Sequence, residues 1–194
     1  MAMAFDAEDD RSDEALLALY GRGDAGAARV LTLRLTPLAF RVAARMLGDK
    51  AEAEDVAQEA MLRLWRQAPN WQGGQARVTT WLYRVAVNLA TDRLRKRRGL
   101  PLDEAPEPVE TAPGAVGRMI EAERAAALDA ALMALPERQR EAVILRHLEG
   151  LSNPEIAEIM GVGVEAVESL TARGKRGLTA ALAGRRAELG YDDD

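Results

Sequence analysis

The chain has 194 residues, a formal net charge of −5 and no cysteine. This length fits one large domain or two small ones. Without cysteine, the chain has no disulfide framework, no thiolate metal site and no thiol nucleophile. Hydrophobic residues make up 48% of the chain but aromatic residues only 4%, and this balance favours helical cores over sheets.

The ends and the hydropathy pattern bear on where the protein works. The N-terminus is acidic, with neither a basic start nor an apolar run, and no 18 consecutive residues are apolar. We therefore expect no secretory signal, no membrane insertion and a cytoplasmic location.

Charge is distributed unevenly. Residues 1–14 hold six acids against Arg11, whereas residues 77–98 hold seven bases against one acid, a local charge of +6. A basic segment in an acidic chain indicates a confined contact with a polyanion, because a general nucleic-acid coat needs a basic protein.

The first predicted helices follow from capping and breaking residues. Ser12 can cap a helix that runs to Tyr20, and a longer helix is predicted over 24–47, ended by Gly48. Pro37 lies inside that second pattern, so we expect it to kink or interrupt the helix.

A third helix is predicted over 51–67, where apolar residues recur at helical spacing. They are Val56, Ala57, Ala60, Met61, Leu64 and Trp65. Pro69 stops this helix, and residues 70–78 form a loop by their glycines.

A fourth helix is predicted over 81–97, started by Thr79 or Thr80. Leu82, Val85, Ala86 and Leu89 form its apolar stripe, and a polar row faces the other way: Arg84, Asn88, Asp92 and Arg95. With Trp71, Arg77 and Trp81 nearby, this helix is a plausible platform for unstacked bases. The alternative is structural: arginines complement a helix C-terminus, and tryptophans serve more often in cores than in stacking.

Residues 100–113 contain four of the eight prolines, several acids and no helical period. They predict an extended, flexible linker. We therefore divide the chain into domains 12–98 and 118–186 around a linker over 99–117. Helices are predicted in the second domain over 118–134, 137–149, 152–160 and 164–182. The expected fold class is all-α: two small helical bundles joined by a flexible, acidic, Pro-rich linker.

Residues 150–178 have the layout of a helix-turn-helix, whose second helix enters the DNA major groove. Ser152 and Glu155 form a capping box, and Gly161 permits the left-handed step that ends the first helix. In the second helix, 3.6 residues per turn place Val167, Leu170, Thr171, Gly174 and Leu178 on one side. The other side carries Glu165, Glu168, Ser169, Ala172, Arg173 and Arg176. A solvated amphipathic hairpin is the alternative interpretation of this segment.

Three segments in order resemble the extracytoplasmic-function (ECF) sigma factors, small specificity subunits of bacterial RNA polymerase. They are AEAEDVAQEAMLRLWR (51–66), TTWLYRVAVNLATDRLRKRR (79–98) and LPERQREAVILRHLEGLSNPEIAEIMGVGVEAVESLTARGKRGL (135–178). The resemblance covers most of residues 15–183, and the proline-rich gap falls where the family joins its two domains.

The resemblance implies partners and site residues. Asp55, Gln58 and Glu59 would dock on a coiled coil of the polymerase's largest subunit, unless they are simply solvated surface residues. Residues around the fourth helix would recognise and open the −10 promoter element: Trp71, Arg77, Trp81, Arg84, Asn88, Asp92 and Arg95. The helix-turn-helix would read the −35 element through Glu168, Ser169, Ala172 and Arg173, with Lys175 and Arg176 on phosphates. An anti-sigma factor is an expected partner.

Other functions remain open on the residues alone. A stand-alone helix-turn-helix regulator would usually dimerise and bind paired half-sites, and a helical adaptor would contact no DNA at all. We expect no enzyme, metal or cofactor, because the only histidine, His147, has no Ser, Cys or carboxylate constellation around it and is assigned to surface or packing.

Overall fold

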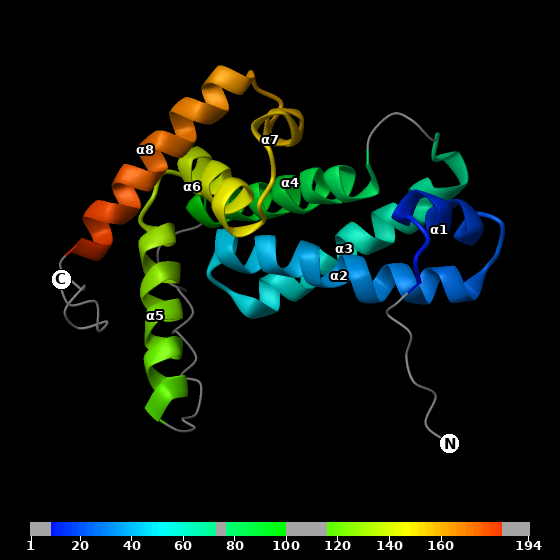
Figure 1. The fold of residues 1–194 in the computed structure, drawn as a ribbon, viewed down its shortest axis with the longest axis horizontal. Coiled ribbons are helices and arrows are strands. Elements are labelled where there is room, and N and C mark those ends of the chain that lie inside the picture. Colours follow the sequence, from blue (N-terminus) through cyan, green and yellow to red (C-terminus); the bar gives the residue numbers. More distant parts are fainter. Residues whose placement is uncertain (1–8, 73–76, 100–115, 184–194) are drawn as a thin grey trace.

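The structure, a computed structural model, describes residues 9–72, 77–99 and 116–183, and in these ranges it is helical without a strand. The expected all-α class is confirmed. The elements are α1 (Asp13–Tyr20), α2 (Ala25–Leu47), α3 (Lys50–Gln67), the 3₁₀ turn η1 (Ala68–Asn70), α4 (Val78–Arg98), α5 (Val116–Met133), α6 (Glu137–Val143), the π-helical turn η2 (Ile144–Leu148), α7 (Asn153–Met160) and α8 (Val164–Ala183) (Figure 1).

Local chemistry fixes where the first helices begin and end. The side chains of Ser12, Asp24 and Asp49 each accept a hydrogen bond from the amide three residues on, at 3.2, 3.1 and 3.0 Å. These bonds satisfy amides that have no partner inside the helix. Gly48 takes φ 66° and ends α2, as predicted.

The structure corrects two sequence-based expectations about helix limits. Of the kink or interruption expected at Pro37, the interruption does not occur, because α2 is continuous from Ala25 to Leu47. The buried side chains of Leu35 and Ala39 pack on both sides of the proline, so tertiary contact offsets the one lost hydrogen bond. The fourth helix begins at Val78 and not after a threonine cap. The Glu14 carboxylate of α1 accepts the Val78 amide at 3.0 Å and supplies that cap from another helix.

The first bundle consists of α1 to α4. Helices α2, α3 and α4 pack against one another, and α1 packs on α2 (Figure 1). Its core is aliphatic and fully buried, with Leu31, Leu35, Val56 and Leu64 among the residues at 0% exposure. The expected apolar face of α3 is confirmed, with Trp65 only partly buried.

The second bundle consists of α5 to α8, with α8 laid along α6 and α7 (Figure 1). The approach of α8 to α6 depends on glycine. A Cβ at Gly174 would lie 2.5 Å from Val143 Cγ2, and one at Gly177 would lie 2.5 Å from Leu135 Cδ2. At Gly174 the added atom would also lie 3.0 Å from the Gln139 carbonyl of α6, so glycine at this position permits the close approach of the two helices.

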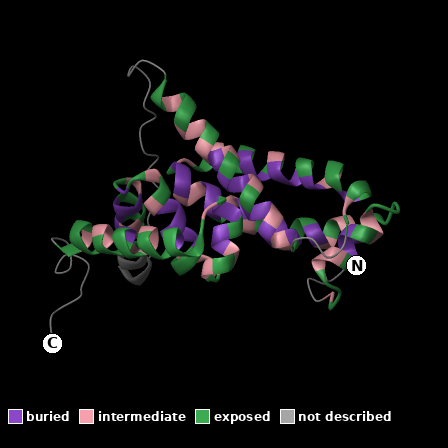
Figure 2. Ribbon diagram, turned by 90° about the horizontal axis from the view of Figure 1, so that it is seen from above, coloured by how far each residue is buried: buried purple, intermediate pink, exposed green. Residues whose placement is uncertain are grey.

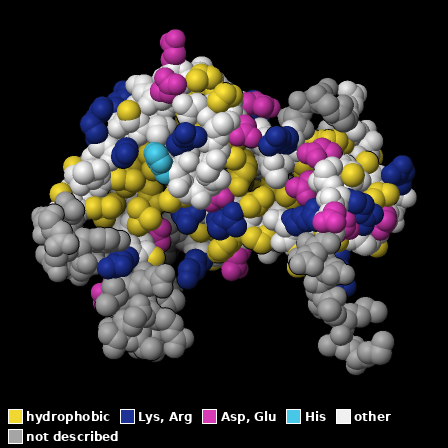
Figure 3. Space-filling view, viewed as in Figure 1, with side chains coloured by type: hydrophobic (Ala, Val, Ile, Leu, Met, Phe, Trp, Pro, Cys, Tyr) yellow, Lys and Arg dark blue, Asp and Glu magenta, His cyan; other side chains and the backbone are white. Residues whose placement is uncertain are grey.

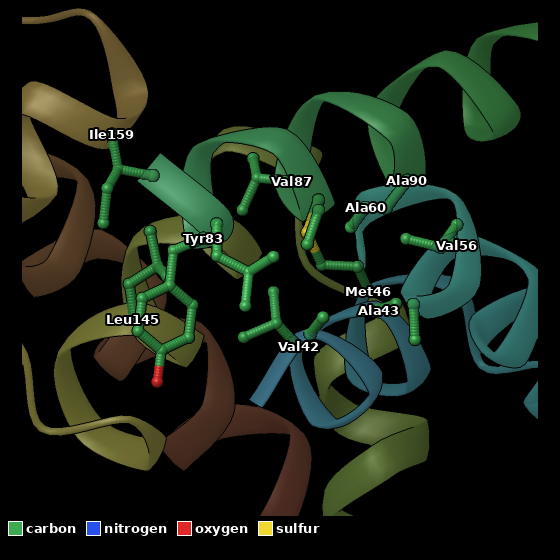
Figure 4. Packing of buried hydrophobic residues seen from close by; sticks show 14 of the residues in the cluster. Val42, Ala43, Met46, Val56, Ala60, Tyr83, Val87, Ala90, Leu145 and Ile159 are labelled. Carbon is green, nitrogen blue, oxygen red and sulfur yellow. The ribbon is translucent and has the colours of Figure 1, made fainter. Parts of the chain in front are cut away.

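The two bundles share one continuous hydrophobic core. Tyr83 and Val87 of α4 lie beside Leu145 and Ile159 of the second bundle, with Val42 of α2 close by (Figure 4). Helix α4 is therefore packed by α2, α3 and α7. The predicted linker over 100–113 lies outside the described residues. Within the described ranges, no helix is both long and apolar enough to span a lipid bilayer.

Candidate nucleic-acid interface

The helix-turn-helix forms as the sequence predicts. The Glu155 carboxylate accepts the Ser152 amide at 2.9 Å and the Ser152 hydroxyl at 2.6 Å, so the capping box is present. These bonds lower the pKa of Glu155. Gly161 takes φ 64° and ends α7, which lets the chain turn into α8.

Helix α8 has one face on the protein and one face in solvent. Val167 and Gly174 are buried, and Leu170, Thr171 and Leu178 are partly buried. Every residue assigned to the outer face is exposed: Glu165, Glu168, Ser169, Ala172, Arg173 and Arg176, together with Lys175. Figure 2 shows this helix mostly exposed along its length, and Figure 3 shows basic side chains on its outer edge. The geometry leaves the face free to enter a groove.

The candidate −35 residues are positioned by neighbours. Arg173 Nη2 donates to Ser169 Oγ at 2.7 Å, and Arg173 Nε donates to the Ser169 carbonyl at 3.2 Å. Asn153 Nδ2 donates to Glu168 Oε1 at 3.4 Å. The exposed part of α8 therefore offers both an arginine and a carboxylate; such groups read guanine and the cytosine amino group respectively.

The polar row of α4 is also in solvent. Arg84, Asn88, Asp92 and Arg95 are all exposed, and Arg95 Nη1 lies 4.0 Å from Asp92 Oδ1. The predicted apolar stripe is confirmed too, with Leu82 and Ala86 buried. Sequence periodicity missed Tyr83 and Val87, which are buried as well because the second bundle covers them.

Trp71 and Trp81 form a pair next to this row. Their rings meet edge to face, with centroids 6.0 Å apart and planes at 84°. Both side chains are partly buried, and Trp71 Nε1 is buried without a hydrogen-bond partner among the residues that the structure describes. The pairing is favourable for aromatic rings, and it places two π-faces at the start of α4. Residues 73–76 of the intervening loop lie outside the described residues.

The basic segment over 77–98 splits into two groups. Arg93, Arg97 and Arg98 bind the protein itself. Arg97 contacts Asp49 and Glu52 at 3.3 and 2.9 Å, Arg93 donates to the Glu52 carbonyl, and Arg98 pairs with Glu137 of the second bundle.

The second group in this segment faces water. Arg84, Arg95 and Lys96 are exposed, and Arg77 is 77% exposed although it lies 3.5 Å from Glu155 of α7. This second group is the part of the segment that can contact phosphates.

The candidate polymerase contacts lie on α3. Asp55 and Gln58 are exposed and Glu59 is partly exposed. Glu59 accepts from Arg63 at 2.9 Å, and this hydrogen bond lowers its pKa. Leu62, one turn beyond Gln58, is 48% exposed, so an apolar side chain accompanies the polar ones. Sequence reasoning did not assign Leu62 to the site, although the helical period already leaves it outside the predicted apolar face.

His147 is exposed on η2, in agreement with a surface role (Figure 3). Its pKa is lowered by partial burial and by the neighbouring charges of Lys175 and Arg146. The structure brings these three basic side chains together beside the helix-turn-helix, a grouping that their separation in sequence conceals.

Two family models match the chain. Sigma-70 region 2 matches residues 31–99 and sigma-70 region 4 matches residues 125–178. The first match contains α4 with its polar row, and the second contains the helix-turn-helix.

Individual proteins are similar over nearly the whole chain. The ECF RNA polymerase sigma factor SigM of Mycobacterium tuberculosis is 34% identical over 181 residues, covering 93% of this chain and 90% of the relative. The RNA polymerase sigma-H factor of Pseudomonas aeruginosa is 35% identical, covering 88% and 93%. Among solved structures, CnrH in complex with the cytosolic domain of CnrY matches with a TM-score of 0.67 at 26% identity, covering 90% of this chain and 99% of that one. The chain therefore belongs to the ECF family of RNA polymerase sigma factors.

Proposed function

We propose that this chain directs RNA polymerase to a set of promoters by contacting the −35 element with α8 and the −10 element with α4. One observation carries the proposal: a single chain presents two exposed polar helix faces, one in each of the two segments that match sigma-70 regions. The corresponding domains are residues 12–98 for the polymerase and the −10 element, and residues 118–186 for the −35 element.

At the −35 element, α8 enters the major groove of duplex DNA. Glu168, Ser169, Ala172 and Arg173 face base edges, and Lys175 and Arg176 neutralise phosphates. The bonds from Ser169 and Asn153 hold Arg173 and Glu168 in the free protein. Because these two side chains start out ordered, less conformational entropy is lost on binding.

At the −10 element, the exposed row on α4 contacts the strand that becomes unpaired. Arg84, Asn88 and Arg95 supply positive charge and hydrogen-bond donors, and Asp92 supplies an acceptor for a base amino group. Arg77, Trp71 and Trp81 flank the loop in which a flipped base is held. Melting follows because single-stranded bases bind better than paired ones, which shifts the equilibrium toward the open state.

The polymerase supplies the catalysis, and this chain makes and breaks no bond. Asp55, Gln58 and Glu59 of α3 dock on the coiled coil of the largest subunit, with Leu62 as an apolar contact beside them. Once one promoter element is bound, the other is presented at a high effective concentration, so two moderate contacts select a promoter together.

The setting of this activity is the bacterial cytoplasm, where the polymerase works, and an anti-sigma factor controls it. Two solved structures that resemble this chain in fold support this part: CnrH bound to the cytosolic domain of CnrY, and the sigma factor RpoE of Bartonella quintana bound to the anti-sigma factor NepR.

In vitro transcription tests the proposal. Core polymerase, this protein and a pool of upstream DNA fragments should give specific transcripts that depend on the added protein. A set of fragments that share two motifs would define the promoter. Binding to operator DNA without any effect on core polymerase would instead identify a stand-alone regulator, and binding to core without DNA selection would identify an adaptor.

A further inference from the structure

A carboxylate of the second bundle is buried among donors of the first. The Glu149 side chain, which follows η2, is only 1% exposed. Its oxygens accept from Arg41 Nη2 at 3.0 Å, from Arg45 Nη1 at 3.1 Å and from the Tyr83 hydroxyl at 2.9 Å. These donors come from α2 and α4, so the contact joins the bundles across more than 100 positions of sequence in the case of the arginines.

A second polar contact crosses the same interface, and here the donor belongs to the second bundle and the acceptor to the first. Arg140 of α6 is buried, and its Nη1 donates to the Met46 carbonyl at the end of α2 at 2.6 Å. Its Nη2 donates to the carbonyl of Leu135 at 3.3 Å. Burial lowers the pKa of Arg140. At the same interface, Leu145 and Ile159 of the second bundle lie beside Tyr83 and Val87 of the first (Figure 4).

We infer that Glu149, with Arg41, Arg45 and Tyr83, forms a latch that keeps the free chain closed and unable to grip both promoter elements. The inference rests on the proposed function, because it concerns when the two DNA-binding faces reach their elements. It adds that the chain restrains itself, through its own side chains, before any partner binds.

The compact chain is too small to reach both promoter elements at once, so the closed form and the promoter-bound form exclude each other. The −10 and −35 elements lie about 25 base pairs apart, roughly 85 Å along the helix axis at about 3.4 Å per base pair. A compact chain of 194 residues has a radius of gyration of about 16 Å and is therefore about 40 Å across. The bundles must separate before α4 and α8 reach their elements on straight DNA.

Contacts between the bundles also indicate that the closed form hinders DNA binding. The first helix of a helix-turn-helix crosses the DNA backbone, but α7 packs against α4 in the closed form. Arg77, a candidate −10 contact, lies 3.5 Å from Glu155 at the start of α7. The closed form therefore holds one DNA-binding unit against the other.

The latch is a two-state element because its charges are satisfied in both states. When closed, Glu149 has three protein donors; when open, water solvates the carboxylate and both arginines. Removing the acid leaves Arg41 and Arg45 without their shared partner in the closed form alone, so the equilibrium shifts toward the open form.

The test measures the distance between the bundles directly. The chain has no cysteine, so Gln67→Cys on α3 and Thr179→Cys on α8, both at exposed positions, accept two spin labels. We expect a narrow distance distribution in the parent. In Glu149→Gln we expect a second, longer population, increased at least tenfold over the parent. Glu158→Gln, which removes an exposed acid of α7, should leave the distribution unchanged.

The same variants then report on DNA. If closure restrains binding, the affinity of the isolated protein for a fragment with both elements, the −10 element pre-opened, should rise about tenfold in Glu149→Gln. A circular dichroism spectrum like the parent's shows that the helices are retained, and Tyr83→Phe, which deletes only the hydroxyl, gives a smaller shift in the same direction.

The outcomes separate this inference from the proposed function. Identical distance distributions in parent and Glu149→Gln overturn the latch, and so does a parent that is already broadly open. A longer distance without a gain in DNA affinity overturns the restraint on binding. A longer distance in a protein that gives no transcripts with core polymerase would keep the latch and reject the proposed function.

Discussion

The two candidate DNA-binding helices are held in opposite ways. Helix α8 lies on the outside of its bundle, and close approach at Gly174 and Gly177 lets it rest on α6 with its outer face free. Helix α4 is packed by α2, α3 and α7, and its own arginines tie it to α3. The outer face of α8 is therefore exposed to solvent, whereas α4 divides its surface between the exposed candidate row and contacts that hold the protein together.

The helix that packs under α8 carries a group that makes stability depend on pH. In this helix, α6, Glu141 is 1% exposed, and burial raises its pKa to about 7 despite Arg138 at 3.0 Å, while Glu137 adds to the rise. The native state therefore holds a proton that the unfolded chain has released between about pH 4.5 and 7. Stability contributed by this group is present below pH 4.5 and falls as pH rises through 7, by about 3 kcal/mol.

Glu141→Gln should reduce the pH dependence of the free energy of unfolding. Urea unfolding at pH 5 and pH 8 measures it, and the difference between variant and parent isolates Glu141 from other titrating groups. The exposed Glu158→Gln is the matched control. Equal slopes for Glu141→Gln and the parent would show that Arg138 keeps the carboxylate charged at both pH values.

We expect substitutions on α8 and on α4 to affect different steps of promoter recognition. Arg173→Ala should weaken binding to −35 duplex DNA by about 1–3 kcal/mol, or about 5–150-fold, because a base-edge contact is lost. It should not affect polymerase association or transcription from a template whose −10 region is already unpaired. Arg84→Ala should show the reverse, with normal −35 binding and slower opening of duplex promoters in a permanganate footprint. A variant that fails in both assays would contradict the division of labour.

Close helix packing can be broken at one residue. Gly174→Ala places a Cβ 2.5 Å from Val143 Cγ2 and 3.0 Å from the Gln139 carbonyl, and we expect a loss of about 1–2 kcal/mol of unfolding free energy. Gly163→Ala, where an added Cβ meets nothing within 4 Å, should cost less. Thermal unfolding of the two variants measures the difference; equal melting temperatures would mean that α8 can shift outward at no cost.

Two neighbouring basic residues of α4 should show the smallest effects but the clearest contrast between a structural and a DNA-binding side chain. Arg97→Ala removes contacts with Asp49 and Glu52 from a side chain that is 33% exposed, so we expect about 1 kcal/mol of destabilisation. Lys96→Ala, at an exposed position, should leave the melting temperature unchanged. It should reduce the salt dependence of DNA binding by about one phosphate contact. Swapped results would reverse our assignment of the two residues.

Sequence reasoning succeeded where a helix packs against the protein on one side only. The 3.6-residue period placed Val167 and Gly174 inside and Arg173 outside, because α8 packs on one side only. The period could not identify Tyr83 and Val87, because a helix packed on several sides has no single apolar stripe.

Residues that are distant in sequence set the remaining features. Glu149 precedes a glycine at a helix end, as many solvated acids do, and only Arg41 and Arg45 from α2 make it a buried partner. Likewise, the start of α4 follows from a carboxylate of α1 and not from its own threonines. The assignment of each candidate residue to DNA or polymerase remains a prediction.

The tryptophans give the molecule an optical signal of its own. All three lie in the first bundle: the Trp65 ring is tilted against Tyr20 with centroids 4.5 Å apart, and the Trp71 and Trp81 ring centroids lie 6.0 Å apart beside the loop at the start of α4. Tryptophan emission from the unlabelled protein therefore reports on the first bundle and not on α8. A base that slips between the paired indoles will quench that emission, so the moment of strand capture can be timed by stopped-flow fluorescence.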